Sequence, residues 1–210
     1  MEPASVDAAD LPSGTQIWLI RHGETEWSKS GQHTGRTDIP LTVVGEAEAR
    51  ALRPLAASIR PALVLCSPRR RALDTARLAG LRVDAVDDDL AEWDYGDYEG
   101  RTTAEIRAAV PGWTLWAAGC PGGESAAQVS ARADRVLARA RAALSNGPVV
   151  FVAHGHISRV IGARWTSRPA SDGRHLMLGT ATVSILGAEH GQPALARWNL
   201  PNPSSPELIP

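Results

Sequence analysis

The chain has 210 residues and a mass of 22.3 kDa, which fits one domain of ordinary size, and we expect a single domain over 1–210. With 22 basic and 23 acidic residues the formal net charge is −1, so no global field attracts nucleic acid or an anionic membrane, and any anion site must be local. Two cysteines make neither a disulfide framework nor a four-ligand zinc site, and we see neither an apolar leader nor a membrane-length apolar run, so we expect a soluble cytoplasmic protein.

The first half of the chain alternates between apolar runs and helical patterns. In chain order we predict an irregular lead-in (1–15), a buried strand (16–20), a helix (43–59), a second buried strand (62–67) and a second helix (69–79). Pro54 is expected to kink the first helix, because proline lacks the amide hydrogen that a helix interior needs. Gly80 closes the second helix.

The second half continues the same alternation. We predict a short strand (82–86), an acidic turn (87–89), a long amphipathic helix (124–144), a buried strand (149–153) and a helix (154–165). Two further strands (182–187 and 194–199) and an irregular tail (200–210) follow. Ser125 is the expected N-cap of the long helix. We expect the acidic turn to be exposed, and Arg132, Arg135 and Arg139 to form a solvated face of that helix.

Strands that alternate with helices of this length predict an α/β fold, as a three-layer αβα sandwich with a mainly parallel central sheet. Ligands bind such sheets outside the carboxyl ends of the strands. Polar clusters follow three of the predicted strands, at 21–23, 67–71 and 154–156. The sequence therefore predicts a polar site at one end of the sheet.

These clusters contain two His-Gly pairs and several arginines. A neutral imidazole can attack phosphorus as a nucleophile, and guanidinium groups match phosphoryl oxygens with forked donors. The alternative is that His22 and His154 are structural residues that happen to follow strands. Their matching contexts favour phosphate chemistry at a shared crevice.

Six ordered motifs extend this pattern over most of residues 16–165. They are L-I-R-H-G-E-T-E-W (19–27), G-R-T-D-I-P-L-T-x-x-G (35–45), S-P-R-R-R-A-L-D-T-A (67–76), E-W-D-Y-G-D-Y-E-G (92–100), P-G-G-E-S (121–125) and V-A-H-G (152–155). Together they resemble the histidine phosphatase superfamily in its phosphoglycerate-mutase-like branch. The segment 92–125 is most similar to actinobacterial acid phosphatases.

The resemblance implies a role for each matching residue. It makes His22 the nucleophile that becomes phosphohistidine and Glu92 the general acid for the leaving alcohol. His154 would act with them on the phosphoryl group. The implied substrate-binding residues are Arg21, Ser28, Thr34, Gly35, Arg71 and Gly155. At position 28, family members often carry Asn, so one phosphate hydrogen bond could be lost in this chain.

Several residues keep a second interpretation. Alignment on the motif selects Arg71 for the pocket, whereas Arg69 and Arg70 are expected to be solvated. Cys66 is expected to be a buried strand residue, and the pair His154 and His156 lacks the companion ligands of a metal site. Trp113 and Trp116 either cover the substrate or pack the domain.

We therefore predict a phosphomonoester hydrolase of the acid phosphatase type that needs no metal and no cofactor. Its expected partner is a small phosphorylated metabolite, with no nucleic acid or membrane, and a homodimer is possible. The alternatives are a cofactor-dependent phosphoglycerate mutase and a non-catalytic module that binds phosphorylated ligands. Thr103 stands where mutases of the family typically place Lys, which favours the hydrolase.

Overall fold

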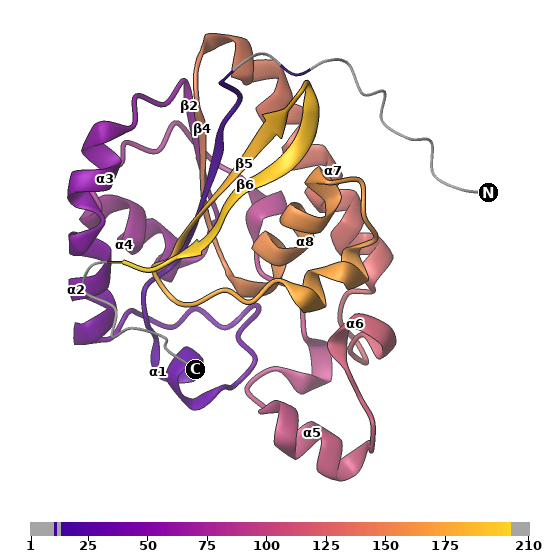
Figure 1. Ribbon diagram of the computed structural model, residues 1–210. Helices are drawn as coiled ribbons and strands as arrows, with labels where there is room; N and C mark the ends of the chain where they lie inside the picture. Colours follow the sequence, from indigo (N-terminus) through magenta and orange to yellow (C-terminus); the bar gives the residue numbers. More distant parts are fainter. Residues whose placement is uncertain (1–10, 12–13, 203–210) are drawn as a thin grey trace.

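The computed structural model describes residues 11 and 14–202, and its centre is one six-stranded sheet (Figure 1). The strands are β1 (Ile17–Arg21), β2 (Leu63–Cys66), β3 (Ala85–Val86), β4 (Val149–Ala153), β5 (Val183–Glu189) and β6 (Gln192–Leu200). Their order across the sheet is β3-β2-β4-β1-β5-β6. The first four are parallel, and β5 and β6 form an antiparallel hairpin beside β1. The prediction of a mainly parallel sheet is confirmed.

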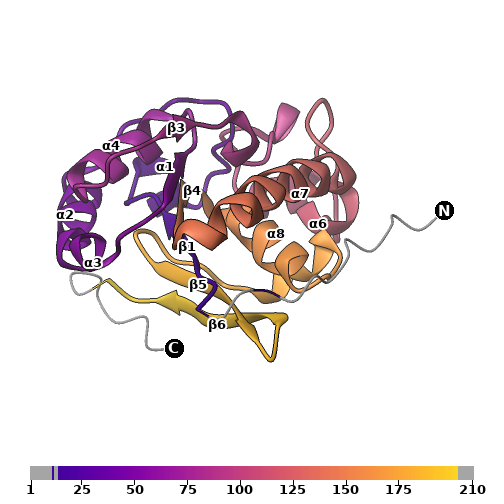
Figure 2. The same ribbon diagram turned by 90° about the horizontal axis from the view of Figure 1, so that it is seen from above.

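Helices cover both faces of this sheet, which confirms the three-layer arrangement (Figure 2). One face packs against α2 (Val43–Ala51), α3 (Arg53–Ser58) and α4 (Arg70–Leu78). The other face packs against α7 (Ala126–Ala143) and α8 (Gly155–Trp165). Because both faces are covered, all five residues of β4 are buried, which explains its uninterrupted apolar sequence.

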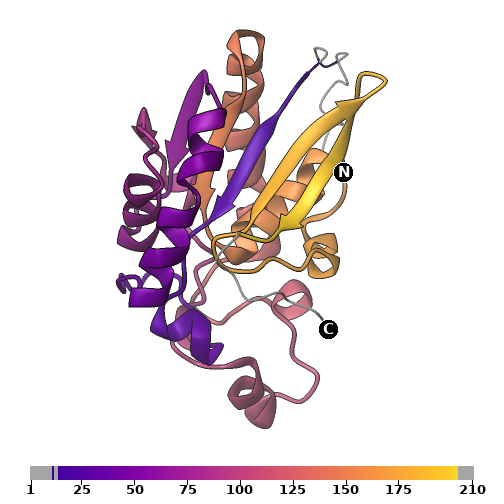
Figure 3. The ribbon, with the colours of Figure 1, turned by 60° about the vertical axis from the view of Figure 1, so that its left-hand side comes forward.

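Shorter helices lie around the carboxyl ends of the parallel strands. They are α1 (Glu26–Ser30), α5 (Thr103–Ala109), α6 (Leu115–Ala118) and 3-10 turns at Asp88–Leu90, Gly96–Tyr98 and Ala170–His175, whereas a further 3-10 turn at Leu144–Asn146 precedes β4 at the opposite end. Figure 3 shows α5 and α6 projecting beyond the sheet at the same end as α1. The sequence did not predict α5 or α6. Among the described helices, none is both long and apolar enough to cross a membrane.

Most predicted ends differ from the observed ones by one to three residues, and one difference changes the number of helices. The single helix expected over 43–59 is two helices that meet at Leu52, because Pro54 occupies the first turn of α3, where its missing amide hydrogen costs nothing. Strand β6 includes Leu200, one residue beyond the expected end. Most of the segments predicted to be irregular, at 1–15 and 200–210, lie outside the described residues.

The acidic turn and the arginine face of α7 were predicted as solvated, and this holds for Asp88, Arg135 and Arg139, which are exposed, but not for Arg132 or for the paired Asp87 and Asp89. Asp89 pairs with Arg135 at 2.5 Å and with Arg139 at 2.6 Å, and Asp87 pairs with Arg139 at 2.7 Å. The side chain of Arg132 is only 12% exposed. The charges of the turn and of the helix therefore neutralise each other at the surface.

Candidate active site

The ends of β1 and β4 bring the two histidines together. The two strands pair in parallel so that Arg21 lies opposite Ala153, and His22 donates its amide hydrogen to the Ala153 carbonyl at 3.0 Å. The rings of His22 and His154 face each other edge to face, with 5.1 Å between their centroids. The expected convergence of the clusters at 21–23, 67–71 and 154–156 is thus observed.

His22 is held in one tautomer. Its Nδ1 lies 2.7 Å from the carbonyl oxygen of Gly23, and because a carbonyl only accepts, Nδ1 carries the hydrogen. The lone pair of the neutral ring is therefore on Nε2. Burial, followed by the guanidinium groups of Arg71 and Arg21, holds the pKa of His22 well below its usual value. The ring therefore stays neutral into mildly acidic solution.

His154 uses both ring nitrogens inside the protein. Its Nδ1 accepts a hydrogen bond from Nε of Arg71 at 3.1 Å, so Nε2 carries the hydrogen and donates to the hydroxyl of Ser67 at 2.6 Å. Burial, followed by the charge of Arg71, places the pKa of His154 well below its usual value. His154 is therefore a neutral residue that fixes Arg71 next to His22.

Arg71 is fully buried and organises the loop that follows α1. Its Nη1 donates to the carbonyl of Thr37 at 3.0 Å, and its Nη2 donates to the carbonyls of Thr34 and Gly35 at 2.9 and 3.3 Å. With Nε on His154, one Nη1 hydrogen remains for a ligand. Arg21 donates to Leu178 at 2.5 Å, and its buried Nε has no partner within the described part of the chain.

Glu92 occupies the amino terminus of α8. Oε1 accepts from the amides of Trp93 and Ile157, and Oε2 accepts from the amide of His156, each at 2.9 Å. Each carboxylate oxygen offers two lone pairs, so Oε2 keeps one that no described donor takes. The carboxyl group at this helix terminus is thus that of Glu92, which accepts from the amides of His156 and Ile157 but not from the amide of Gly155.

A pair of residues that the sequence analysis missed holds Glu92 in place. Arg132 spends all five N–H groups, on both carboxylate oxygens of Glu124 and on the carbonyls of Asp89, Ala91 and Glu92. Glu124 also accepts the amide hydrogen of Asp94 at 3.0 Å. We call Arg132 and Glu124 the clamp, because together they fix the segment that carries Glu92 against α7.

The remaining predicted residues contribute mainly through their backbone or their packing. Ser28 uses its hydroxyl in the capping box of α1, where it accepts from the Thr25 amide at 2.9 Å and donates to the Thr25 carbonyl at 3.0 Å. Thr34 and Gly35 present carbonyls to Arg71, and Gly35 donates its amide to Glu99 at 2.9 Å. A Cβ on Gly155 would lie 3.5 Å from Arg21 and 3.6 Å from Oε2 of Glu92, so these two groups converge above it.

Three alternatives left open by the sequence are now decided. Arg70 is exposed, whereas Arg69 is half-buried and its buried Nε has no partner in the described chain, so only Arg70 fits the solvated interpretation. Cys66 is a buried free thiol whose pKa burial raises to about 12, which confirms its structural role. His154 and His156 direct their rings to different partners, since Nδ1 of His156 lies 2.7 Å from the Tyr95 hydroxyl.

Trp113 and Trp116 pack within the domain and also line a cavity. Trp113 is buried, packs on the Tyr98 ring and donates from its indole nitrogen to Gly119 at 2.9 Å. Both tryptophans also line a cavity of about 570 Å³ that includes His156, whose amide binds Glu92. The cavity is therefore next to the predicted general acid.

Comparisons with known proteins agree with this geometry. The family model for the histidine phosphatase superfamily (branch 1) matches residues 17–201. An acid phosphatase of Mycobacterium tuberculosis is 48% identical over 183 residues, covering 86% of this chain and 90% of the relative. Sedoheptulose 1,7-bisphosphatase of Saccharomyces cerevisiae is 39% identical, covering 74% and 69%. A solved Mycobacterium tuberculosis structure has 47% identity and a TM-score of 0.86, covering 89% of this chain and 98% of that one.

Proposed function

The chain belongs to branch 1 of the histidine phosphatase superfamily and is a phosphatase, and we propose that it hydrolyses phosphomonoesters through a phosphohistidine on Nε2 of His22. The observation that carries this proposal is the tautomer of His22. A hydrogen bond from Nδ1 to the Gly23 carbonyl leaves the lone pair on the nitrogen that faces away from the chain's own backbone.

In the first step, the Nε2 lone pair of His22 forms a bond to phosphorus while the bond to the leaving oxygen breaks. Glu92 enters this step as the carboxylic acid, with its proton on the Oε2 lone pair that no described donor occupies, and gives that proton to the leaving oxygen. Arg21 and the free Nη1 hydrogen of Arg71 stabilise the phosphoryl oxygens. The products are an alcohol and a phosphohistidine.

In the second step, water attacks the phosphohistidine. Glu92, now a carboxylate, takes one proton from this water, the N–P bond breaks, and its electron pair returns to Nε2 of His22. Inorganic phosphate then leaves, and both residues are back in their starting forms. His154 has a positioning role throughout, because it accepts from Arg71 and donates to Ser67.

The mutase alternative is less well supported. A mutase must protect its phosphohistidine from water while the substrate reorients. Thr103, at the position where mutases of the family typically have Lys, lies in the wall of the cavity of about 570 Å³. We propose that 3-phosphoglycerate to 2-phosphoglycerate conversion is at least ~100-fold slower than in a dedicated mutase, or ~2.7 kcal/mol.

Labelling of the enzyme tests this proposal. Rapid quench with ³²P-labelled substrate in EDTA should trap an acid-labile, base-stable phosphoenzyme in the wild type and in the control His190→Ala, whose imidazole is exposed at the β5–β6 turn. His22→Ala should give no label and lose nearly all activity. Equal labelling of His22→Ala and wild type would overturn the assignment.

Four predictions from the sequence remain proposals beside this one. They are the single domain over 1–210, the cytoplasmic location, the absence of a nucleic-acid partner and the homodimer. The relatives support a small phosphorylated substrate.

A further inference from the structure

The cavity of about 570 Å³, here called the side cavity, starts beside the general acid. Its residues come from the loop after α1, from α5 and α6, from α8 and from the 3-10 turn at 170–175. His156 joins it to Glu92, since the His156 amide donates to Oε2. Because Oε2 protonates the leaving oxygen, the rest of the leaving alcohol extends from that point into the side cavity.

The acid–base side chains that line the side cavity are all basic. Its lining includes three arginines and three histidines and no carboxylate, and they are Arg107, Arg159, Arg174, His33, His156 and His175. Within the described part of the chain, none of these arginines pairs with a carboxylate. A cavity built only from cationic and neutral donors favours an anion.

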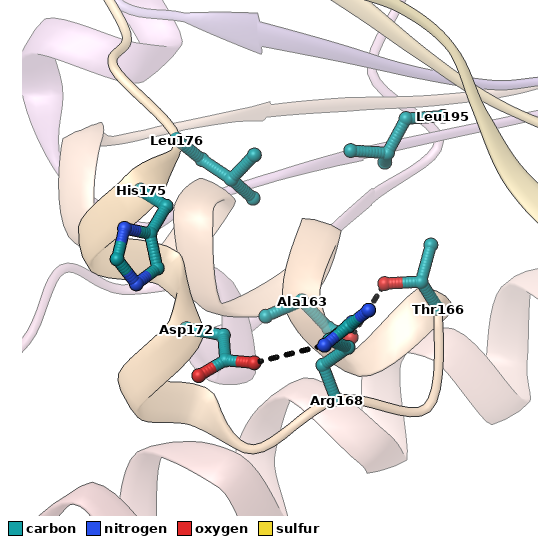
Figure 4. Close-up of a pocket in the computed structure, with 7 residues that line it drawn as sticks. All are labelled: Ala163, Thr166, Arg168, Asp172, His175, Leu176 and Leu195. Carbon is teal, nitrogen blue, oxygen red and sulfur yellow. Dashed lines mark hydrogen bonds and ion pairs between the residues drawn. The ribbon is translucent and has the colours of Figure 1, made fainter.

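A second cavity, of about 210 Å³, shares His175 with the side cavity and contains an arginine that is paired with a carboxylate (Figure 4). There, Arg168 lies 3.7 Å from the carboxylate of Asp172, and the Thr166 hydroxyl donates to the Ala163 carbonyl at 3.0 Å. Arg168 and Thr166 of this smaller cavity thus each have a partner among its own lining residues. The arginines of the side cavity differ, because no acidic residue is among the residues that line it.

Arg159 is held ready for a ligand. Its Nε donates to the Gly173 carbonyl at 2.9 Å, its Nη2 donates to the Arg174 carbonyl at 3.1 Å, and its guanidinium lies 4.7 Å from the centre of the Trp116 ring. These contacts fix the plane of the group and leave both Nη1 hydrogens available. Burial lowers the pKa of Arg159, and the nearby charge of Glu92 offsets this only in part, so a bound anion would stabilise the guanidinium further.

We propose that the side cavity binds a second anionic group, a phosphate or a carboxylate, on the leaving alcohol of the substrate, with Arg159 and Arg174 as its main contacts. The preferred substrates are thus phosphomonoesters with an anionic leaving group, and Trp116 provides a flat wall for the carbon skeleton that joins the two anions. This inference rests on the proposed function, because it takes Glu92 as the group beside the leaving oxygen.

Matched substrate pairs test the proposal. The first pair is 3-phosphoglycerate and glycerol 3-phosphate, in which a carboxylate replaces a hydroxymethyl group. The second pair is fructose 1,6-bisphosphate and fructose 6-phosphate, in which the added anion is a phosphate. We expect kcat/KM to be at least about 10-fold higher for the anionic member of one pair, and the pair with the larger ratio identifies the anion. Ratios below about 3-fold in both pairs would overturn the proposal.

Variants connect the preference to the cavity. Arg159→Met keeps an apolar contact with Trp116, and Arg174→Gln changes an exposed side chain whose Nε donates only to His175 at 2.9 Å, so at least the second variant should fold like wild type. Each variant should bring the ratio of kcat/KM for the anionic member to kcat/KM for the neutral member toward 1. Each should keep kcat/KM for the neutral member within about 3-fold of the wild-type value. Arg168→Gln is the control, because its guanidinium faces Asp172 instead. Unchanged ratios in both cavity variants would overturn the proposal.

The proposed function fails in a different way. If His22→Ala hydrolysed the neutral members as fast as wild type, the phosphohistidine mechanism would be wrong whatever the cavity binds. If His22→Ala is inactive and wild type shows no preference within either pair, only the cavity proposal is wrong.

Discussion

The proposed phosphoryl-binding end and the side cavity position their arginine and histidine side chains in different ways. At the phosphoryl-binding end, defined by Arg21, His22, Arg71 and His154, the side chains are fixed by backbone carbonyls and by each other at the ends of buried parallel strands. In the side cavity, Arg107, Arg174 and His175 are exposed and come from short helical turns.

This difference separates chemistry from substrate choice. Moving a strand end would disturb the sheet, because Arg21 and His22 continue the β1–β4 ladder, so the attacking and phosphoryl-binding groups have little freedom. The turns that line the side cavity cover one end of the sheet without pairing with it. Changes at the first region should therefore affect every substrate, whereas changes at the second should affect substrates unequally.

Arg71→Ala should have the largest effect of the predicted substitutions. It removes the phosphoryl donor and also releases the carbonyls of Thr34, Gly35 and Thr37, so we expect kcat/KM to fall by about 10³-fold or more for every phosphomonoester. Arg71→Lys should restore little, because one ammonium cannot replace a fork that binds three carbonyls and a histidine. Equal activity of Arg71→Lys and wild type, in steady-state assays, would show that the fork is not needed.

Part of this contrast between regions is visible in the sequence. The strand at 149–153 and the cap at Ser125 were predicted correctly, because a continuous apolar run and a capping box are local signals. The meeting of His22 and His154 followed from the rule that parallel strands end at the same edge. Glu92 came only from the resemblance, since nothing in its neighbourhood differs from an ordinary turn.

The clamp and the side cavity were beyond the reach of the sequence. Arg132 lies eight positions after Glu124 on a helix with many surface arginines, and its five hydrogen bonds go mostly to carbonyls, which every residue has. The turns that carry Arg159's partners, Gly173 and Arg174, have no periodic pattern. Contacts of this kind depend on the tertiary path of the chain rather than on local propensity.

Glu92→Gln should have the second largest effect, and the effect should depend on the leaving group. An alkyl phosphate needs a proton on its leaving oxygen, so we expect its kcat to fall by about 10²-fold or more and to lose its alkaline limb. p-Nitrophenyl phosphate has a stable leaving anion and should lose much less. pH profiles of kcat for both substrates measure this, and an equal loss for both would contradict the role of Glu92 as the acid.

Arg132→Ala should have a smaller effect of the same kind. Loss of the clamp frees the segment that carries Glu92, so we expect kcat for an alkyl phosphate to fall by about 10-fold and kcat for p-nitrophenyl phosphate to change less. The protein should also lose about 3 kcal/mol of stability, because the half-buried carboxylate of Glu124, which is 19% exposed, is left without its partner.

The control for the clamp is Arg135→Ala, on the same helix. The side chain of Arg135 is 57% exposed and pairs with Asp89 rather than with Glu92 or Glu124. Its removal should therefore leave the ratio of kcat for an alkyl phosphate to kcat for p-nitrophenyl phosphate unchanged. If Arg132→Ala lowered both rates by the same factor, Arg132 would be a structural residue and not a positioning residue for Glu92.

The smallest predicted effect concerns stability and pH, and it involves both regions. Burial places the pKa of His22, His154 and His156 well below the usual value, whereas in the unfolded chain these imidazoles titrate near ~6.5. Below that pH, the unfolded chain binds protons that the folded protein does not, so the free energy of unfolding decreases as the pH falls. Above about 6.5 the rings are neutral in both states and contribute no pH dependence.

Each buried histidine adds a slope of up to about 1.4 kcal/mol per pH unit. His156→Gln should therefore make the slope between pH 6.5 and 5.5 shallower by about that amount, because it removes the one ring of the three that lies in the side cavity. Urea unfolding at pH 7.5, 6.5 and 5.5 in phosphate-free buffer measures both slopes. Identical slopes for wild type and His156→Gln would mean that His156 is protonated in the folded protein, and the side cavity would then carry one more positive charge in acid than its burial predicts.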